Sequence, residues 1–172
     1  GGEFTSLKEL MEEVTSEATR FFYINRKSNQ HLDFDLDLAK EESKDNPLYY
    51  IQYAHARICS IFNKLNKENR SYNEKIAKKS LENLRGEKEI EILQTLSQFP
   101  DVVERAANKY EPHLICYYLR NLASYFHGYY NSEKVLVENE EKLQARLFML
   151  SAIKQVIFNG LTLLGISSPK SM

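Results

Sequence analysis

Tyrosine, arginine and amide side chains recur at helical spacing after Asn46, and these side-chain types contact nucleic-acid bases. At about 100° per residue, one arc of a helix begun there carries Asn46, Tyr50, Tyr53, Arg57 and Lys64. Phenol rings and guanidinium planes stack on unpaired RNA bases, while amide and phenol groups bond base edges. The stripe therefore predicts an RNA-contacting surface. The same spacing also allows tyrosines that cap the edge of a core with their hydroxyls in water.

A core must lie beside this stripe, because a second arc, centred roughly 120° away from it, is apolar. It carries Ile51, His55, Ile58, Phe62 and Leu65. His55 is therefore expected to be a partly buried core histidine rather than a catalytic base. Asn46 as N-cap and Pro47 at the first helical position predict where this helix begins.

A second aromatic cluster, YFHGYYN at 125–131, ends the tyrosine-rich helix expected over 112–128. Tyr129 falls on the wide apolar face of that helix, so we expect it in the core. Tyr130 follows Gly128 and lies beyond the expected end of the helix. This position leaves its ring free to face a ligand.

The chain carries no sequence signature of a catalytic or metal site. It has no glycine-rich phosphate loop, no His-x-x-x-His pair and no nucleophile elbow. The alternating aspartates at 33–37 are not expected to form a calcium loop, because apolar residues intervene and the glycine of such a loop is missing. Cys59 and Cys116 are too few for a disulfide framework or a zinc site and are expected in the core of an intracellular protein.

Length and charge indicate one globular domain with an acidic appendage. The chain has 172 residues, of which 42% are apolar, and a net charge of −1. A chain of this length and apolar content can form a core without a disulfide or a metal. Residues 1–45 carry 6 basic and 11 acidic side chains, residues 46–90 carry 9 and 5, and residues 91–172 carry 8 of each. The basic middle is either a solvated face or a contact for phosphates. No apolar run is long enough to span a membrane, and the first residues do not have the hydrophobic region expected of a signal peptide.

Helical periodicity accounts for all but one of the expected elements. Helices are expected over 6–14, 15–24, 46–66, 73–85, 88–98, 101–108, 112–128 and 140–164, with Gly165 as the C-cap of the last. The segment 32–38 alternates apolar and acidic residues, which predicts a short strand or an extended connector. The expected fold class is all-α: a helical bundle with a short helical and extended N-terminal connector.

Three segments resemble the C-terminal part of arginyl-tRNA synthetases. They are HLDFDLDLAKEES at 31–43, NPLYYIQYAHARI at 46–58 and ARLFMLSAIKQVIFNGLTLLGISSPKSM at 145–172. The resemblance spans essentially the whole chain and implies a fragment of a class I aminoacyl-tRNA synthetase. Residues 1–45 would be the C-terminal remnant of the catalytic domain, and residues 46–172 an all-helical anticodon-binding domain of the DALR type.

The resemblance implies a non-catalytic module that binds the anticodon stem-loop of arginine tRNA. The parent enzyme would attach arginine to that tRNA, using ATP and magnesium in a catalytic domain expected before Gly1, whereas the fragment would need no cofactor and no metal. The parent is expected to be a cytoplasmic monomer without membrane contact. The family's anticodon platform falls on Asn46, Tyr50, Tyr53, Arg57, Tyr130 and Met172. The family's Ala-Arg-Leu signature is present at 145–147, but Gln144 precedes it instead of an acidic residue.

An alternative function is a helical protein-interaction module that places the same tyrosine and arginine stripe on a partner helix. Ionic strength separates the two hypotheses. Binding to RNA weakens steeply as salt is added, whereas an apolar contact between helices barely responds.

Overall fold

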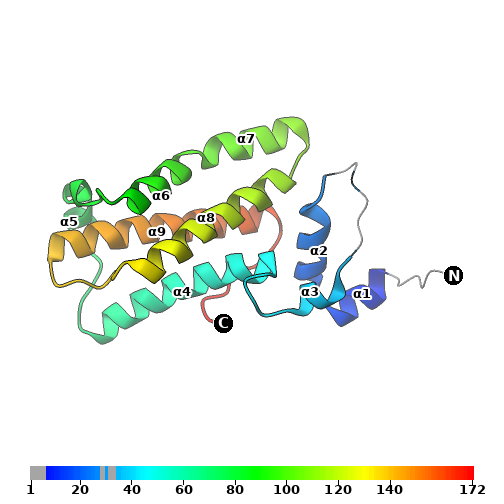
Figure 1. Ribbon diagram of the computed structural model, residues 1–172, viewed down its shortest axis with the longest axis horizontal. Coiled ribbons are helices and arrows are strands. Elements are labelled where there is room, and N and C mark those ends of the chain that lie inside the picture. Colours follow the sequence, from blue (N-terminus) through cyan, green and yellow to red (C-terminus); the bar gives the residue numbers. More distant parts are fainter. Residues whose placement is uncertain (1–6, 28–29, 31–33) are drawn as a thin grey trace.

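The computed structural model describes residues 7–27, 30 and 34–172, and every regular element in that part of the chain is helical (Figure 1). The elements are α1 (Leu7–Glu13), α2 (Ser16–Ile24), α3 (Leu36–Lys40), α4 (Pro47–Lys67), α5 (Glu74–Lys79), the 3-10 helix η1 (Leu81–Asn83), α6 (Glu87–Ser97), α7 (Phe99–Lys109), α8 (His113–Ser132) and α9 (Glu140–Leu163). The expected all-α class is confirmed. None of the described helices is long and apolar enough to cross a membrane.

The three long helices α4, α8 and α9 pack against one another and form the centre of the bundle (Figure 1). Helices α6 and α7 cover α8, α5 packs on α9, and α1–α3 lie at the other end of the bundle from α5. Fully buried core side chains include Ile51, Ile58, Leu65, Leu119, Leu122, Phe126, Leu143, Leu147 and Leu150. Each such side chain stabilises the fold by about 1.5–3 kcal/mol relative to exposure. Because these residues recur at helical spacing, each of the three helices has an apolar face, and burial of these faces packs the helices together.

The start of α4 and the end of α9 form as their sequences predict. Helix α4 has Asn46 as its N-cap and a proline in its first turn, where the missing proline N–H has no intrahelical partner to lose. After α9, Gly165 adopts a φ of +69°. The N–H of Ile166 then reaches the carbonyl of Leu161 at 2.9 Å, which completes a Schellman ending.

The expectation of a strand or extended connector over 32–38 is wrong for the residues that the structure describes. Residues 31–33 lie outside the described residues, but Leu36–Lys40 form the helix α3. Asp35 begins this helix, because its Oδ1 accepts the N–H of Leu38 at 2.9 Å, as an N-cap aspartate does. The alternation of apolar and acidic residues over this short segment therefore did not indicate a strand, and Asp35 was instead the N-cap of a helix.

Two other expected boundaries are also corrected. The helix expected over 73–85 is divided into α5 and η1. The break occurs at the buried Ser80, whose carbonyl accepts the side-chain Nδ2 of Asn83 at 3.0 Å. The tyrosine-rich helix does not end at Gly128 but continues to Ser132, because a single helical glycine costs only about 1 kcal/mol and Tyr129 is held in the core.

The chain after α9 folds back along α4. His55, only 5% exposed, donates its Nδ1–H to the carbonyl of Pro169 at 2.8 Å. From α2, Glu17 accepts the backbone N–H of Ser167 at 2.9 Å. His55 is therefore the buried histidine that its place in the apolar arc predicts, and its contact holds the C-terminal tail beside α4.

Candidate nucleic-acid interface

A groove of about 890 Å³ lies between α4, the end of α8, the connection from α8 to α9 and the end of the chain. Its α4 side is lined by Tyr53, Ala56, Arg57, Ser60, Ile61, Lys64 and Glu68. The other side is lined by Tyr130 and the connection 133–138, and Ser171 and Met172 line it as well. Segments that are distant in the sequence therefore meet in one concave surface.

Arg57 contacts two tyrosine rings in this groove. Its Cζ lies 4.4 Å from the ring centroid of Tyr53 and 4.8 Å from that of Tyr130. Its Nη2 also donates to the Tyr53 hydroxyl at 2.6 Å. Each cation–π contact at a partly exposed site contributes about 0.5–1 kcal/mol. Together these contacts fix the direction of the guanidinium and link α4 to α8.

His127 packs behind Arg57 and connects it to the backbone of α4. Its Nε2–H donates to the carbonyl of Tyr50 at 3.2 Å, which leaves Nδ1 as the acceptor for Arg57 Nη1 at 3.5 Å. The ring also stacks on Tyr53, with centroids 5.7 Å apart. Burial lowers the pKa of His127, the bond to the carbonyl of Tyr50 raises it, and the charge of Arg57 lowers it. The neutral imidazole is the form that these contacts require.

Most of the site residues predicted from the sequence meet in the groove. Tyr53, Arg57, Tyr130 and Met172 all line it. Tyr130 and Met172 are 38% and 51% exposed, so a ligand can reach both side chains. Tyr50 does not line the groove, because its half-buried ring packs on His127 with centroids 4.5 Å apart.

Asn46 is not on the exposed stripe, and this part of the prediction is wrong. The side chain is 5% exposed. Its Oδ1 accepts two first-turn N–H groups of α4, and its Nδ2 donates to the carbonyls of Ala39 and Glu41 at 3.3 and 2.9 Å. The amide is thus engaged by the protein on both sides, since it caps α4 and also ties down the segment that follows α3.

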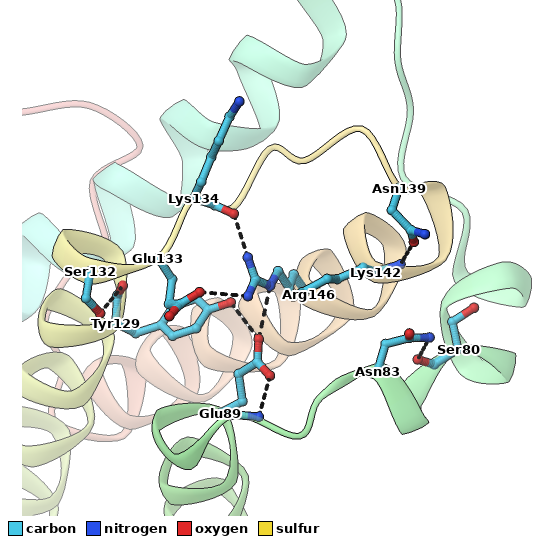
Figure 2. Close-up of polar contacts among 11 residues, drawn as sticks. Ser80, Asn83, Glu89, Tyr129, Ser132, Glu133, Lys134, Asn139, Lys142 and Arg146 are labelled. Atoms are coloured by element: carbon cyan, nitrogen blue, oxygen red, sulfur yellow. Dashed lines mark hydrogen bonds and ion pairs between the residues drawn. The ribbon is translucent and has the colours of Figure 1, made fainter.

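A buried ion-pair network lies next to the α8–α9 connection (Figure 2). Arg146 and Glu89 are 4% and 3% exposed, and Arg146 Nε lies 3.0 Å from Glu89 Oε1. The Tyr129 hydroxyl donates to the same Glu89 oxygen at 3.0 Å. Arg146 also reaches Glu133 Oε2 at 2.9 Å and the carbonyl of Lys134 at 2.6 Å. The arginine of the Ala-Arg-Leu signature therefore joins α9 to α6 and to the connection.

No site role was predicted from the sequence for the connection 133–138, for Arg70 or for the Glu89–Arg146 pair. One signal was available for the pair, because Arg146 occupies a core position of α9 between Leu143 and Leu150. A charged residue at such a position needs a buried partner. Nothing local pointed to Glu89 as that partner, since 57 residues separate the two.

Gln144, the departure from the signature, is also structural. It is fully buried, accepts the N–H of Asn73 at 2.7 Å and donates to the carbonyl of Ser71 at 2.8 Å. The amide supplies a donor and an acceptor together, which a carboxylate does not. Among the described residues, no group of three or more histidine, cysteine, aspartate or glutamate side chains could hold a metal ion.

Residues 51–172 match the DALR anticodon binding domain. The chain belongs to this family. The resemblance seen in the motifs is thus confirmed, and all the residues that line the groove fall within the matched part of this DALR domain.

Full-length proteins are similar to the whole chain. The arginine–tRNA ligases of Coxiella burnetii (strain RSA 493 / Nine Mile phase I) and Acinetobacter baylyi are 51% and 52% identical to it, over 100% and 99% of the chain. The arginyl-tRNA synthetase structure from Thermus thermophilus superposes with a TM-score of 0.77 at 27% identity, covering 99% of this chain and 28% of that one. The chain spans 29% of the length of these two ligases.

Proposed function

We propose that the groove of this DALR domain binds the anticodon loop of an arginine tRNA. The observation that carries the proposal is Arg57, which is held against Tyr53 and Tyr130 within an open groove. Aromatic rings and guanidinium planes of this kind stack on unpaired bases, and the guanidinium N–H groups bond base edges. Met172, which also lines the groove, adds an adaptable apolar contact.

The charges of the groove suit a phosphate backbone. Four cations line it, Arg57, Lys64, Arg70 and Lys134, against the carboxylates of Glu68, Glu133 and Glu138. Glu133 is already paired with Arg146, and Arg70 with Glu140. The other three cations, Arg57, Lys64 and Lys134, outnumber the two other carboxylates, and they add an attraction to RNA that is independent of sequence and decreases with salt.

The names of the relatives support a longer parent enzyme. In this proposal, residues 46–172 are the RNA-binding unit and residues 1–45 belong to the end of a catalytic domain. The parent attaches arginine to its tRNA with ATP and magnesium, as a cytoplasmic monomer. This chain positions the tRNA and performs no chemical step itself.

A matched pair of variants on α8 tests the proposal. Tyr130→Leu removes a ring that lines the groove, whereas Tyr117→Leu removes a ring of similar exposure, 38% against 44%, on the same helix but outside the groove. Stacking of one base on an aromatic ring contributes about 1–3 kcal/mol. Tyr130→Leu should therefore weaken binding of the arginine anticodon stem-loop by about 5- to 140-fold, and Tyr117→Leu should not change it. Fluorescence anisotropy with a labelled stem-loop measures both.

The same titrations separate RNA binding from the protein-interaction alternative. Wild-type affinity should decrease steeply between low and high salt and should depend on the central anticodon base. If both variants bind like wild type, or if a stem-loop with an altered central base binds equally well, the groove is not the anticodon site.

A further inference from the structure

The α8–α9 connection forms one wall of the groove but has little hydrogen bonding of its own. Residues 133–138 all line the groove. Two backbone hydrogen bonds join these residues to one another or to α8. The N–H of Glu133 donates to the carbonyl of Tyr129 at 2.8 Å, and the N–H of Val137 donates to the carbonyl of Val135 at 3.0 Å. Val135 is 5% exposed and anchors the middle of the segment. Other contacts must therefore orient its two ends.

Two arginines from different elements supply these contacts. Arg146 of α9 donates its Nη1–H to the carbonyl of Lys134 at 2.6 Å (Figure 2). Arg70 donates its Nη2–H to the carbonyl of Val137 at 2.8 Å. Both bonds go to backbone atoms, on either side of Val135, and charge-assisted bonds of this kind are stronger than neutral ones.

Both arginines are themselves fixed in place. Glu89 holds Arg146 from α6. After α4, Asn69 adopts a φ of +54°, and the N–H of Arg70 returns to the carbonyl of Leu65 at 3.1 Å. This change of chain direction after α4 brings Arg70 to the connection, although Val137 lies 67 residues further along the sequence.

We infer that Arg70 and Arg146 are positioning residues that hold the connection 133–138 in the form that makes the groove wall, and that this placement sets the groove's preference among anticodon loops. The inference rests on the proposed function. In this role the two arginines act by donating hydrogen bonds to the carbonyls of Val137 and Lys134, and this is separate from any attraction of their charges to phosphate.

Arg70→Met is the decisive variant. The Arg70 side chain is 28% exposed, so the fold tolerates the change, which removes the donor to Val137, the 3.5 Å ion pair with Glu140 and one positive charge. Arg105→Met is the matched control, because Arg105 is exposed on α7, which is outside the groove, and the change removes the same charge. Far-UV circular dichroism establishes that both variants keep the helical fold.

Two measurements on the 172-residue chain decide the role. Hydrogen exchange of the amides in 134–138, without RNA, should be about tenfold faster in Arg70→Met and unchanged in Arg105→Met. The Kd for a stem-loop with an altered central anticodon base, divided by the Kd for the matching stem-loop, should fall about tenfold toward one in Arg70→Met only.

Each remaining outcome overturns a distinct claim. Unchanged exchange in Arg70→Met means that Arg70 does not hold the connection. Faster exchange with an unchanged Kd ratio, both stem-loops being weakened equally, means that Arg70 acts only as a phosphate contact. A wild-type chain without preference between the stem-loops refutes the proposed function, while the exchange result still decides whether Arg70 positions the connection.

Discussion

Two helical glycines should respond in opposite ways to the same substitution. A Cβ on Gly160 of α9 would lie 2.7 and 2.9 Å from the two Cδ atoms of Leu119 on α8, whereas a Cβ on Gly128 of α8 would meet no atom within 4 Å. Carbon atoms in favourable contact lie about 3.5–4.0 Å apart. Leu119 is fully buried, so its side chain can move only against other core side chains, which are close-packed.

The expected magnitudes follow from these distances. Replacing a glycine by alanine inside a helix stabilises it by about 0.8–1.0 kcal/mol, and Gly128→Ala should show this full gain. Overpacking a buried contact costs about 1–3 kcal/mol, so Gly160→Ala should lose about 1 kcal/mol after the helical gain is included. The two variants should therefore differ by about 2 kcal/mol, or about 4–8 °C in Tm for a chain of this length.

Urea unfolding followed by far-UV circular dichroism measures the difference. Wild type and both variants should unfold with the same m value, so that only the midpoint changes. If Gly160→Ala gains as much stability as Gly128→Ala, then Leu119 of α8 does not restrict the space beside Gly160 of α9, and the two helices lie further apart there.

Two further predictions concern buried ionisable groups. Arg146→Met should cost about 3–5 kcal/mol of unfolding free energy, because it leaves the Glu89 carboxylate buried without its partner. Arg85→Met, which breaks a pair whose side chains are 80% and 76% exposed, should change stability by less than about 0.5 kcal/mol; similar losses in urea unfolding would contradict the burial argument. His127 has its pKa lowered from 6.5, mainly by burial, so its contribution to stability is fully present above the unfolded pKa and is lost as the pH falls through the folded pKa. The urea midpoint should thus decrease between pH 7.5 and 5.5, and less so in His127→Gln; an equal decrease in both would exclude His127 as a cause.

The sequence alone determined the elements whose signals are local. Asn46, Pro47 and Gly165 predicted the ends of two long helices, because capping and φ preferences act within one turn of the chain. The tyrosine and arginine stripe placed Tyr53 and Arg57 on one face, since both residues belong to one helix. The motifs at 31–58 and 145–172 indicated the family without any structure.

Tertiary structure alone decided how those elements combine. Asn46 has the side chain of a base-contacting residue, yet the carbonyls of Ala39 and Glu41 take up its donor. Arg146 gains a buried role only because α6 brings Glu89 to it. The connection 133–138 becomes a groove wall through two arginines that lie on either side of it in the sequence. Contacts of this kind depend on which distant segments meet, and helical periodicity carries no information about partners outside its own helix.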